Sequence, residues 1–302
     1  MAKKVTKAVI AAAGFGTRFL PQTKAMPKEM LPLIDKPIIQ YIVEDLVAAG
    51  IEDIIIVGSS TKRSIEDHFD VPREDLLANL RAGGPKKQLY IDKIETVANL
   101  ANFIYVRQKG PYGTGTPILN AAHLIGDEPF IYAFADDITV GQPNTFQQLV
   151  SCYETYDASI LPCVKVQDPV DYSRYGIIAG EEVADDVIKM SGIIEKPGQE
   201  HAPSDFAAVG GYLFKPEVFR YLDEGLRNLN PDQEFYATDC LIAPMLRDGH
   251  DFYGYEVKGT RYDTGDPLEY LKTVIDFGLA HKEYGLQLSA YLRGKHFDGD
   301  KK

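Results

Sequence analysis

The first half of the chain alternates short apolar runs with amphipathic stretches, and this alternation restricts the possible folds more than any other feature. Lys7–Ala12 is an apolar run of strand length, and β-branched residues fill Asp53–Val57, as expected of strands buried on both faces. Between them, Pro37–Ala49 has the periodicity of a helix, with apolar residues four positions apart. This order predicts an α/β fold with a largely parallel sheet.

Weaker signals extend the pattern through the rest of the chain. The last clear helix begins at Asp266, where Asp266 and Glu269 have the spacing of a capping box. No stretch has the composition of a linker, so we interpret residues 1–302 as one continuous unit. The other expected elements are strands over 102–106 and 130–134, a helix over 116–124, strand-like pieces near 159–164, 175–179, 187–194 and 206–214, and helices near 216–227 and 238–247.

Charge and cysteine content exclude several classes of function. The 302 residues include 32 Lys and Arg against 44 Asp and Glu, which gives a net charge of −12 at pH 7. A field of that sign repels nucleic acids and anionic membrane surfaces, so neither is an expected partner. The chain has no apolar run of about 18 residues that would span a bilayer. Three cysteines without a C-x-x-C pair argue against a disulfide framework or a zinc site, and they favour a cytoplasmic location.

A glycine-containing loop follows the first predicted strand. Gly14 and Gly16 permit backbone N–H groups to converge on an anion. The dinucleotide fingerprint would need a third glycine where Phe19 stands, and the Walker A pattern is also unmatched. The segment after the glycines instead carries spaced cations that suit a triphosphate: Arg18, Lys24 and Lys28. A tight turn with surface basic residues would give the same short pattern, so the glycines alone leave both interpretations open.

Acidic residues follow the predicted strand over 130–134. Ligands of open α/β sheets bind beyond the carboxyl ends of the strands. The adjacent carboxylates of Asp136 and Asp137 repel each other unless they share a cation. Mg²⁺ is expected there, since it favours one or two carboxylates plus phosphate oxygens. Asp263 is a candidate second ligand, because Asp266 already supplies the cap of the next helix. Helix capping or turn formation is the alternative explanation for Asp136 and Asp137.

Other short patterns have both a structural and a functional interpretation. A polar loop between Gln108 and Gly113 leads to a predicted helix start, where Thr116 is placed to cap the helix. The pair Glu195-Lys196 ends a strand before a proline, a position typical of solvated surface pairs. Two glycines within strand-like pieces have the character of simple bulges: Gly176 and Gly210.

Three segments taken together are far more specific than these motifs: AAAGFGTRFLP (11–21), TKAMPKEMLPLIDKPIIQYIVEDL (23–46) and SIEDHFD (64–70). They resemble the bacterial sugar-nucleotidyltransferase family, and in particular its members that use UTP. The likeness is strongest over residues 5–70 and continues in pieces to about residue 285. It implies a Rossmann-like nucleotidyltransferase fold with a mixed, mostly parallel central sheet and helices on both faces. It divides the unit into a nucleotide-binding half (1–140), a sugar-binding half (141–265) and C-terminal helices (266–302).

The resemblance also implies an activity, which is transfer of a uridylyl group from UTP to glucose 1-phosphate to give UDP-glucose and pyrophosphate. The implied cofactor is Mg²⁺, and the implied assembly is a homodimer or homotetramer, formed through the C-terminal helices. The sugar phosphate would attack the α-phosphate in line. Because the second pKa of a phosphate is about 6, this nucleophile is already ionised and needs no general base.

The resemblance gives a role to each matching residue. For the nucleotide, the implied contacts are Ala12, Ala13, Gly14 and Gly16 around it, Arg18 and Lys28 on the triphosphate, and Gln108 and Gly113 on the uracil. The implied metal ligands are Asp136 and Asp263. For the sugar, Glu195 contacts the hydroxyls, Lys196 contacts the phosphate, and the hexose approaches the backbone at Gly176 and Gly210. The chain departs from the family pattern at Thr116-Pro117, where relatives often have His-Ala, and at Ala135, where Pro is common. The first departure leaves the preference for the base open.

Two other functions are compatible with parts of this pattern. One is transfer of a thymidylyl or other nucleotidyl group to a different sugar 1-phosphate. The second is a catalytically silent regulator that senses sugar nucleotides. Loss of charged site residues would be expected of such a regulator, yet all are present: Arg18, Lys28, Asp136, Lys196 and Asp263. An NAD-dependent oxidoreductase is disfavoured by the missing third glycine.

Overall fold

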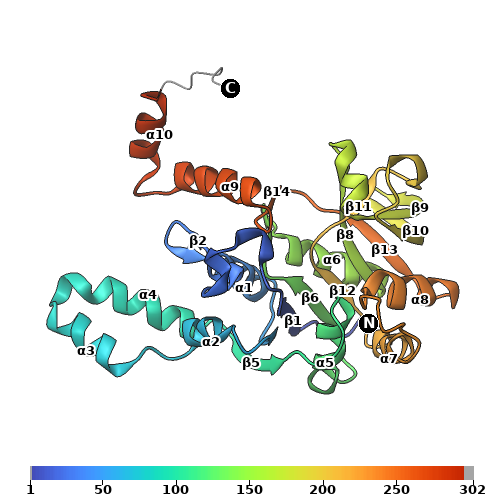
Figure 1. The fold of residues 1–302 in the computed structure, drawn as a ribbon, viewed down its shortest axis with the longest axis horizontal. Helices are drawn as coiled ribbons and strands as arrows, with labels where there is room; N and C mark the ends of the chain where they lie inside the picture. Colours follow the sequence, from blue (N-terminus) through green and yellow to red (C-terminus); the bar gives the residue numbers. More distant parts are fainter. Residues whose placement is uncertain (1, 296–302) are drawn as a thin grey trace.

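The computed structural model describes residues 2–295 and has a ten-stranded mixed sheet at its centre (Figure 1). Only β12, β10 and β11 run opposite to the other strands, so the mixed, mostly parallel sheet of the predicted α/β class is confirmed. In spatial order the strands are β11 (Phe206–Ala208), β9 (Gly176–Ala184), β10 (Val187–Glu195), β13 (Phe252–Glu256), β8 (Ser159–Lys165), β12 (Tyr212–Phe214), β6 (Phe130–Phe134), β1 (Lys7–Ala12), β4 (Asp53–Gly58) and β5 (Asn102–Arg107).

Four parallel strands, β5, β4, β1 and β6, form the first half of the sheet. Successive residues of β1 point to opposite faces, because side chains alternate along a strand. Ile10 packs in one hydrophobic cluster with residues of α1 and α6, whereas Val9 packs in a second cluster with residues of α5 and α7. The sheet is therefore covered on both faces. The four carboxyl ends share one edge, where ligands of such sheets bind.

The helices lie on both faces of the sheet and in two extensions. The α3–α4 pair extends from one side of the molecule, and α9 and α10 lead away from the sheet toward the C-terminus (Figure 1). Among residues 2–295, no helix combines the length and apolar character needed to cross a bilayer. The helices are α1 (Ile38–Ala48), α2 (Arg63–Phe69), α3 (Glu74–Ala82), α4 (Gln88–Ala98), α5 (Gly115–Ile125), α6 (Thr145–Tyr156), α7 (Val218–Arg227), the π-helix η7 (Thr238–Ile242), α8 (Ala243–Arg247), α9 (Pro267–Ala280) and α10 (Gly285–Arg293).

The second half of the sheet closes partly on itself. β11 pairs with both β9 and β8, so that β8, β13, β10, β9 and β11 form a ring. Two short ladders lie outside the main sheet. One joins β2 (Pro32–Leu33) to β3 (Lys36–Pro37), and the second joins β7 (Asp137–Val140) to β14 (Thr260–Asp263), with Asp263 opposite Asp137. The second ladder connects the C-terminal part of the chain to the edge where β6 ends.

Several sequence predictions need correction. Thr116 does not cap α5: it lies inside the first turn, and its hydroxyl donates to the Pro111 carbonyl at 2.6 Å. The piece near 206–214 is two strands, β11 and β12, and the helix expected over 238–247 begins as a π-helix. Four helices were not predicted from the sequence: α2, α6 and the two helices of the α3–α4 extension. Asp266 does cap α9, since its Oδ1 accepts from the N–H groups of Leu268 and Glu269 at 2.9 and 3.2 Å.

The division into halves and C-terminal helices stays an interpretation of the sequence. Both halves contribute strands to the one ten-stranded sheet. Residues 296–302 of the predicted C-terminal segment lie outside the described residues.

The contact between α1 and α6 contains a carboxyl group that weakens the fold at neutral pH. Burial and the neighbouring charge of Glu44 raise the pKa of Asp45 to about 6, although a hydrogen bond from Asn144 opposes the shift. The unfolded chain releases this proton near pH 4. The contribution of the Asp45 carboxyl to the free energy of unfolding is therefore fully present below about pH 4, and it is lost as the pH rises through about 6.

Asp45→Asn should consequently raise the free energy of unfolding by about 1–2 kcal/mol at about pH 8, the shift being discounted for partial exposure. At about pH 4 the variant and the parent should be nearly equal. Urea unfolding at the two pH values measures the difference. The control is Asp67→Asn, an exposed helical carboxylate that should respond little at either pH. An equal gain for Asp45→Asn at both pH values would contradict the assignment.

Candidate active site

The glycine loop follows β1 at the carboxyl edge of the sheet. Gly16 has a φ of +63°, and a Cβ there would lie 3.1 Å from the Thr23 side chain and 3.2 Å from that of Lys28. The Thr23 hydroxyl donates to the Gly16 carbonyl at 2.7 Å. The chain then continues in three short 3₁₀ turns, as expected of a segment interrupted by prolines: η1 (Thr17–Phe19), η2 (Gln22–Lys24) and η3 (Lys28–Met30). This position needs glycine for both its conformation and its packing.

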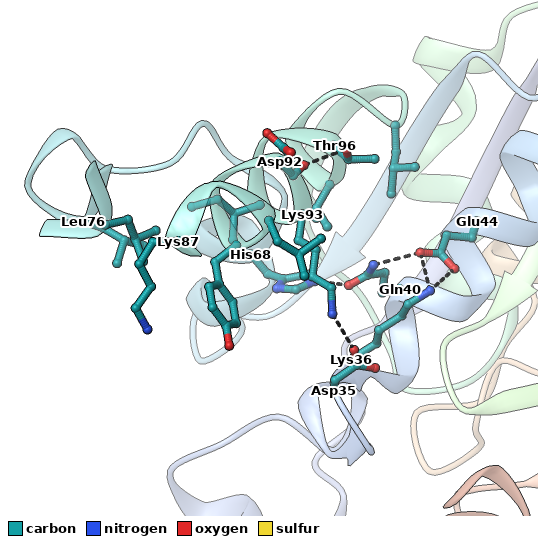
Figure 2. Close-up of a pocket in the computed structure, with 16 residues that line it drawn as sticks. Asp35, Lys36, Gln40, Glu44, His68, Leu76, Lys87, Asp92, Lys93 and Thr96 are labelled. Atoms are coloured by element: carbon teal, nitrogen blue, oxygen red, sulfur yellow. Dashed lines mark hydrogen bonds and ion pairs between the residues drawn. The ribbon is translucent and has the colours of Figure 1, made fainter. Parts of the chain in front are cut away.

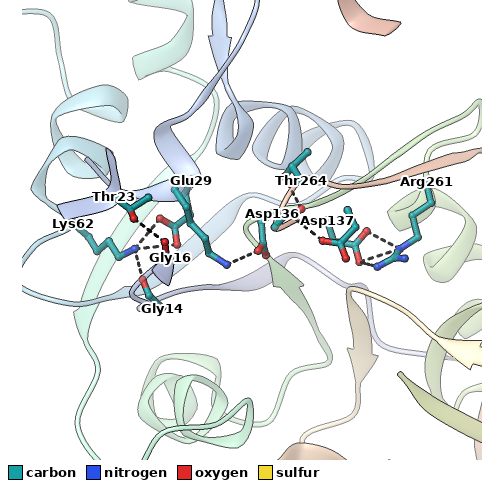
Figure 3. Close-up of polar contacts among 12 residues, drawn as sticks. Gly14, Gly16, Thr23, Glu29, Lys62, Asp136, Asp137, Arg261 and Thr264 are labelled. Atoms are coloured by element: carbon teal, nitrogen blue, oxygen red, sulfur yellow. Dashed lines mark hydrogen bonds and ion pairs between the residues drawn. The ribbon is translucent and has the colours of Figure 1, made fainter. Parts of the chain in front are cut away.

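A buried ion pair lies beneath the loop. Lys62 Nζ contacts Glu29 Oε2 at 2.8 Å, and it also donates to the Gly14 carbonyl at 2.7 Å (Figure 3). Both side chains are almost fully buried, so each charge depends on the other. Neither residue was predicted, because 33 positions separate them and no motif connects them. The pair therefore fixes the backbone of the loop at Gly14.

Lys28 connects the loop to the end of β6 through an ion pair with Asp136. Burial alone would lower the pKa of Lys28, but the Asp136 carboxylate more than offsets this effect, and the pKa is raised. Lys28 is therefore a stable cation at neutral pH.

The two carboxylates predicted to bind a metal converge near Gly265. A Cβ on Gly265 would lie 2.6 Å from Asp136 Oδ2 and 3.1 Å from Asp263 Oδ1. The same point is 3.4 Å from Arg18 Nη2. Three residues from distant parts of the chain therefore meet at one place, and Gly265 provides the room for them.

Asp137 has a different environment from its neighbour Asp136. Arg261 donates to both of its carboxylate oxygens, with Nε 2.9 Å from Oδ1 and Nη2 2.6 Å from Oδ2. The Gly210 N–H also donates to Oδ2, at 3.0 Å. Burial would lower the pKa of Arg261, yet the Asp137 carboxylate raises it. Arg261 thus binds both oxygens of Asp137, whereas Asp136 and Asp263 are the two carboxylates that converge near Gly265.

A cavity of about 260 Å³ opens beside these carboxylates. Lys196 lies on its wall with a φ of +47°, and its Nζ is 5.2 Å from the centre of the Tyr236 ring and 3.5 Å from Glu195 Oε1. The cavity is also lined by aromatic and basic residues that sequence reasoning did not single out: Phe134, Arg174, Tyr212, Tyr236 and Arg261. It brings together all of the predicted sugar-binding and metal-binding residues: Asp136, Gly176, Glu195, Lys196, Gly210 and Asp263.

The residues predicted to bind the nucleotide lie next to this cavity rather than on its wall. The glycine loop and the loop after β5 are neighbours, because the rings of Phe15 and Tyr112 are 5.5 Å apart. The Gln108 N–H donates to the Gly58 carbonyl at 2.8 Å. Gly113 has a φ of +128°, and a Cβ there would lie 2.4 Å from the Phe235 carbonyl oxygen. Ala12 is the last residue of β1, and the loops contain the other predicted nucleotide-binding residues: Ala13, Gly14 and Gly16 in the glycine loop, and Gln108 and Gly113 in the loop after β5.

A second cavity, of about 670 Å³, lies between α1 and the α3–α4 extension (Figure 2). Its polar side is a hydrogen-bonded chain in which His68 contacts Gln40 at 3.0 Å and Gln40 donates to Glu44 at 2.8 Å. Leucines of the extension form the opposite, apolar side. None of the predicted site residues lines this cavity, so the smaller cavity is the candidate active site.

Comparison with known proteins identifies the family of this chain. The sequence profile of the family described as "Nucleotidyl transferase" matches residues 7–277. The chain therefore belongs to the nucleotidyl transferase family, and it is an enzyme of the nucleotidyltransferase class.

Particular members of the family are similar over almost the full length. A UTP–glucose-1-phosphate uridylyltransferase of Bacillus subtilis (strain 168) is 42% identical over 292 residues, which cover 97% of each chain. A structure of UDP-glucose pyrophosphorylase complexed with UDP-glucose is 35% identical, with a TM-score of 0.79 over 97% of this chain and 100% of that one. A UTP-bound enzyme of the same kind from Acinetobacter baumannii is 32% identical, with a TM-score of 0.84 and the same coverage. The resemblance stated from the sequence is confirmed.

Gly210 allows Asp137 to approach the backbone, and this gives a testable prediction. A Cβ on Gly210 would lie 2.4 Å from Asp137 Oδ2 and 2.7 Å from Asp137 Cβ, closer than atoms can approach. Gly210→Ala should displace Asp137 from Arg261 and lower the free energy of unfolding by about 1–3 kcal/mol. Urea unfolding provides the measurement. The matched control is Gly192→Ala, whose Cβ would meet only the Ala179 side chain at 3.8 Å. Equal stability of the two variants would refute this account of Gly210.

Proposed function

We propose that this enzyme transfers a uridylyl group from UTP to glucose 1-phosphate, releasing pyrophosphate and UDP-glucose. The observation that carries the proposal is the convergence of Arg18 and Lys28 on the Asp136–Asp263 pair, beside the cavity that holds Glu195 and Lys196. Two anionic substrates can meet only where cations offset their repulsion. The names of the similar enzymes supply the identity of the substrates.

We propose Mg²⁺ as the cofactor. Within residues 2–295, no cluster of three or more His, Cys, Asp or Glu side chains could hold a metal ion by itself. Two carboxylates, Asp136 and Asp263, do converge, and this donor set fits a Mg²⁺ ion that takes its remaining oxygen ligands from phosphate and water. When bound, the ion would neutralise charge on the α-phosphate.

In the proposed mechanism, the residues of the chain position two phosphates and stabilise charge. Lys28, which pairs with Asp136 in this structure, turns to the triphosphate and, with Arg18, stabilises the departing pyrophosphate. Lys196 holds the phosphate of the sugar, and Glu195 accepts hydrogen bonds from sugar hydroxyls. The attacking phosphate oxygen is already ionised near neutral pH, so no side chain has to remove a proton. Catalysis then depends on alignment and electrostatics.

A pyrophosphate-release assay with UTP, glucose 1-phosphate and Mg²⁺ tests the proposal directly. Substitution of dTTP for UTP, and of other hexose 1-phosphates for glucose 1-phosphate, separates it from the related transferase activities. Release with UTP and glucose 1-phosphate above all other pairs is the expected result. Binding of UDP-glucose without any release of pyrophosphate would instead identify a catalytically silent sensor.

We also propose that the enzyme is a cytoplasmic homodimer or homotetramer. Free thiols at Cys152, Cys163 and Cys240 support the location. An apolar stripe on α9 and α10 supports the assembly, because such a face ordinarily lies against another surface. The large apolar side chains exposed there are Leu268, Leu271, Ile275, Leu279, Leu286 and Tyr291.

The interface can be tested by placing charges in the stripe. The double variant Leu271→Lys, Ile275→Lys should have the mass of a single chain in light scattering, because a desolvated charge opposes association. The unaltered protein should have twice or four times that mass. Leu89→Lys, an exposed leucine on α4, serves as the control and should keep the larger mass. A single-chain mass for the unaltered protein would exclude the proposed assembly.

Lys196→Ala tests the role of the lysine in the cavity. Turnover should fall about 100-fold or more, since a charge that stabilises the reacting phosphates is lost. UTP binding, measured by calorimetry, should remain nearly intact, because Lys196 is assigned to the sugar phosphate. The control is Lys189→Ala, on the strand β10 that precedes Lys196, whose exposed ammonium pairs with Asp251 at 3.0 Å. Equal losses of turnover and UTP affinity in Lys196→Ala would point to a structural role.

A further inference from the structure

We infer that Arg261 and Tyr175 are positioning residues that fix the separation and orientation of Asp136 and Asp263. This inference rests on the proposed function, in which those two carboxylates bind the metal. Neither Arg261 nor Tyr175 faces the convergence point near Gly265 as a ligand would. Each instead contacts a carboxylate of the pair or its immediate neighbour.

The first step is the contact between Arg261 and Asp137. The guanidinium is largely buried and donates two parallel hydrogen bonds to the carboxylate, at 2.9 and 2.6 Å (Figure 3). This bidentate contact fixes both the distance between the guanidinium and the carboxylate and the plane of the carboxylate, whereas a single ammonium group does not fix the plane. Because Asp137 follows Asp136 directly, fixing its side chain restricts the backbone that carries Asp136.

The second step continues from Arg261 through Tyr175 to Asp263. Arg261 Nη1 donates to the Tyr175 hydroxyl at 3.0 Å. A guanidinium can only donate, so the tyrosine oxygen must accept this bond and keep its own proton free to donate elsewhere. Asp263 Oδ2 lies 3.3 Å from that hydroxyl and accepts the hydrogen bond from it. One guanidinium therefore orients both sides of the proposed metal pair.

The backbone supports the same alignment. In the β7–β14 ladder, Asp263 lies opposite Asp137. Thr264 then donates twice to the Asp136 carbonyl, from its N–H at 3.0 Å and from its hydroxyl at 2.6 Å. The ladder sets the two chain segments side by side, and Arg261 and Tyr175 determine how the carboxylates point. Partners that orient metal ligands in this way affect metal affinity without touching the metal.

The alternative is that Arg261 and Asp137 are a structural ion pair with no influence on the carboxylates. Two substitutions separate the possibilities. Arg261→Lys keeps a positive charge beside Asp137 but loses the bidentate contact and the bond to Tyr175. Tyr175→Phe leaves the ion pair between Arg261 and Asp137 intact and removes the hydroxyl that links Arg261 to Asp263. A purely structural pair would make the first variant less stable and leave the second unaffected.

The experiment measures binding of Mn²⁺, used as the probe, to the full-length enzyme in the presence of UDP-glucose, by calorimetry. Arg261→Lys and Tyr175→Phe should each bind Mn²⁺ about 10- to 100-fold more weakly than the unaltered enzyme. Asp136→Asn, which removes a proposed ligand, is the positive control. The matched controls are Arg73→Lys and Tyr41→Phe. Arg73 is exposed and pairs with Asp75, and the Tyr41 hydroxyl donates to the Leu33 carbonyl, away from the site.

Thermal unfolding without metal, and pyrophosphate release, complete the test. Weaker Mn²⁺ binding by Tyr175→Phe, at an unfolding temperature close to that of Tyr41→Phe, supports the inference. Unchanged Mn²⁺ affinity of Tyr175→Phe overturns it, while release of pyrophosphate by the same preparation leaves the proposed function standing. If the unaltered enzyme neither binds Mn²⁺ nor releases pyrophosphate, the proposed function fails, and the inference fails with it.

Discussion

The ion pair between Lys28 and Asp136 joins the glycine loop to the end of β6, and the arrangement of the site depends on it. Each partner comes from a segment with its own support. Lys28 belongs to a loop held from below by Lys62 and Glu29, and Asp136 is held through its carbonyl by Thr264. The contact therefore connects two rigid parts across the carboxyl edge of the sheet. A nucleotide that binds there has to separate Lys28 from Asp136, but the segments that carry the two side chains are already held next to each other, which reduces the cost of ordering them.

This local arrangement explains how an acidic chain can handle phosphates. The net charge of −12 opposes every anion at long range. At the site, however, carboxylates are paired with cations: Asp136 with Lys28, and Asp137 with Arg261. Ions of opposite sign at short range cancel within a few ångströms, whereas the surrounding surface charge is screened by salt within about 10 Å. The contact region is thus electrically distinct from the rest of the surface.

The sequence predicted the elements whose signals are local. Lys7–Ala12 has the predicted bounds, and the second strand is one residue longer than expected, because both are continuous apolar runs in a doubly covered sheet. The α3 and α4 helices were not predicted because each buries only one side chain, Leu77 in α3 and Ile91 in α4, so their apolar periodicity is weak. Arg261 and Lys62 were missed for a different reason. Their partners are 124 and 33 residues away, and no local pattern records such a contact. The site itself was assembled from a family resemblance rather than from spacing.

The segment around Phe235 connects the loop after β5 to the wall of the cavity. The Phe235 N–H donates to the Tyr112 carbonyl at 2.7 Å, and the Gly115 N–H donates to the Phe235 carbonyl at 2.8 Å. The next residue, Tyr236, forms part of the cavity wall. The loop assigned to the base and the wall assigned to the hexose consequently share a backbone ladder. A substitution that alters the base-binding loop would therefore also shift the pocket of the acceptor sugar. A new nucleotide preference in this scaffold would have to evolve through paired substitutions, one in each part, rather than through single ones.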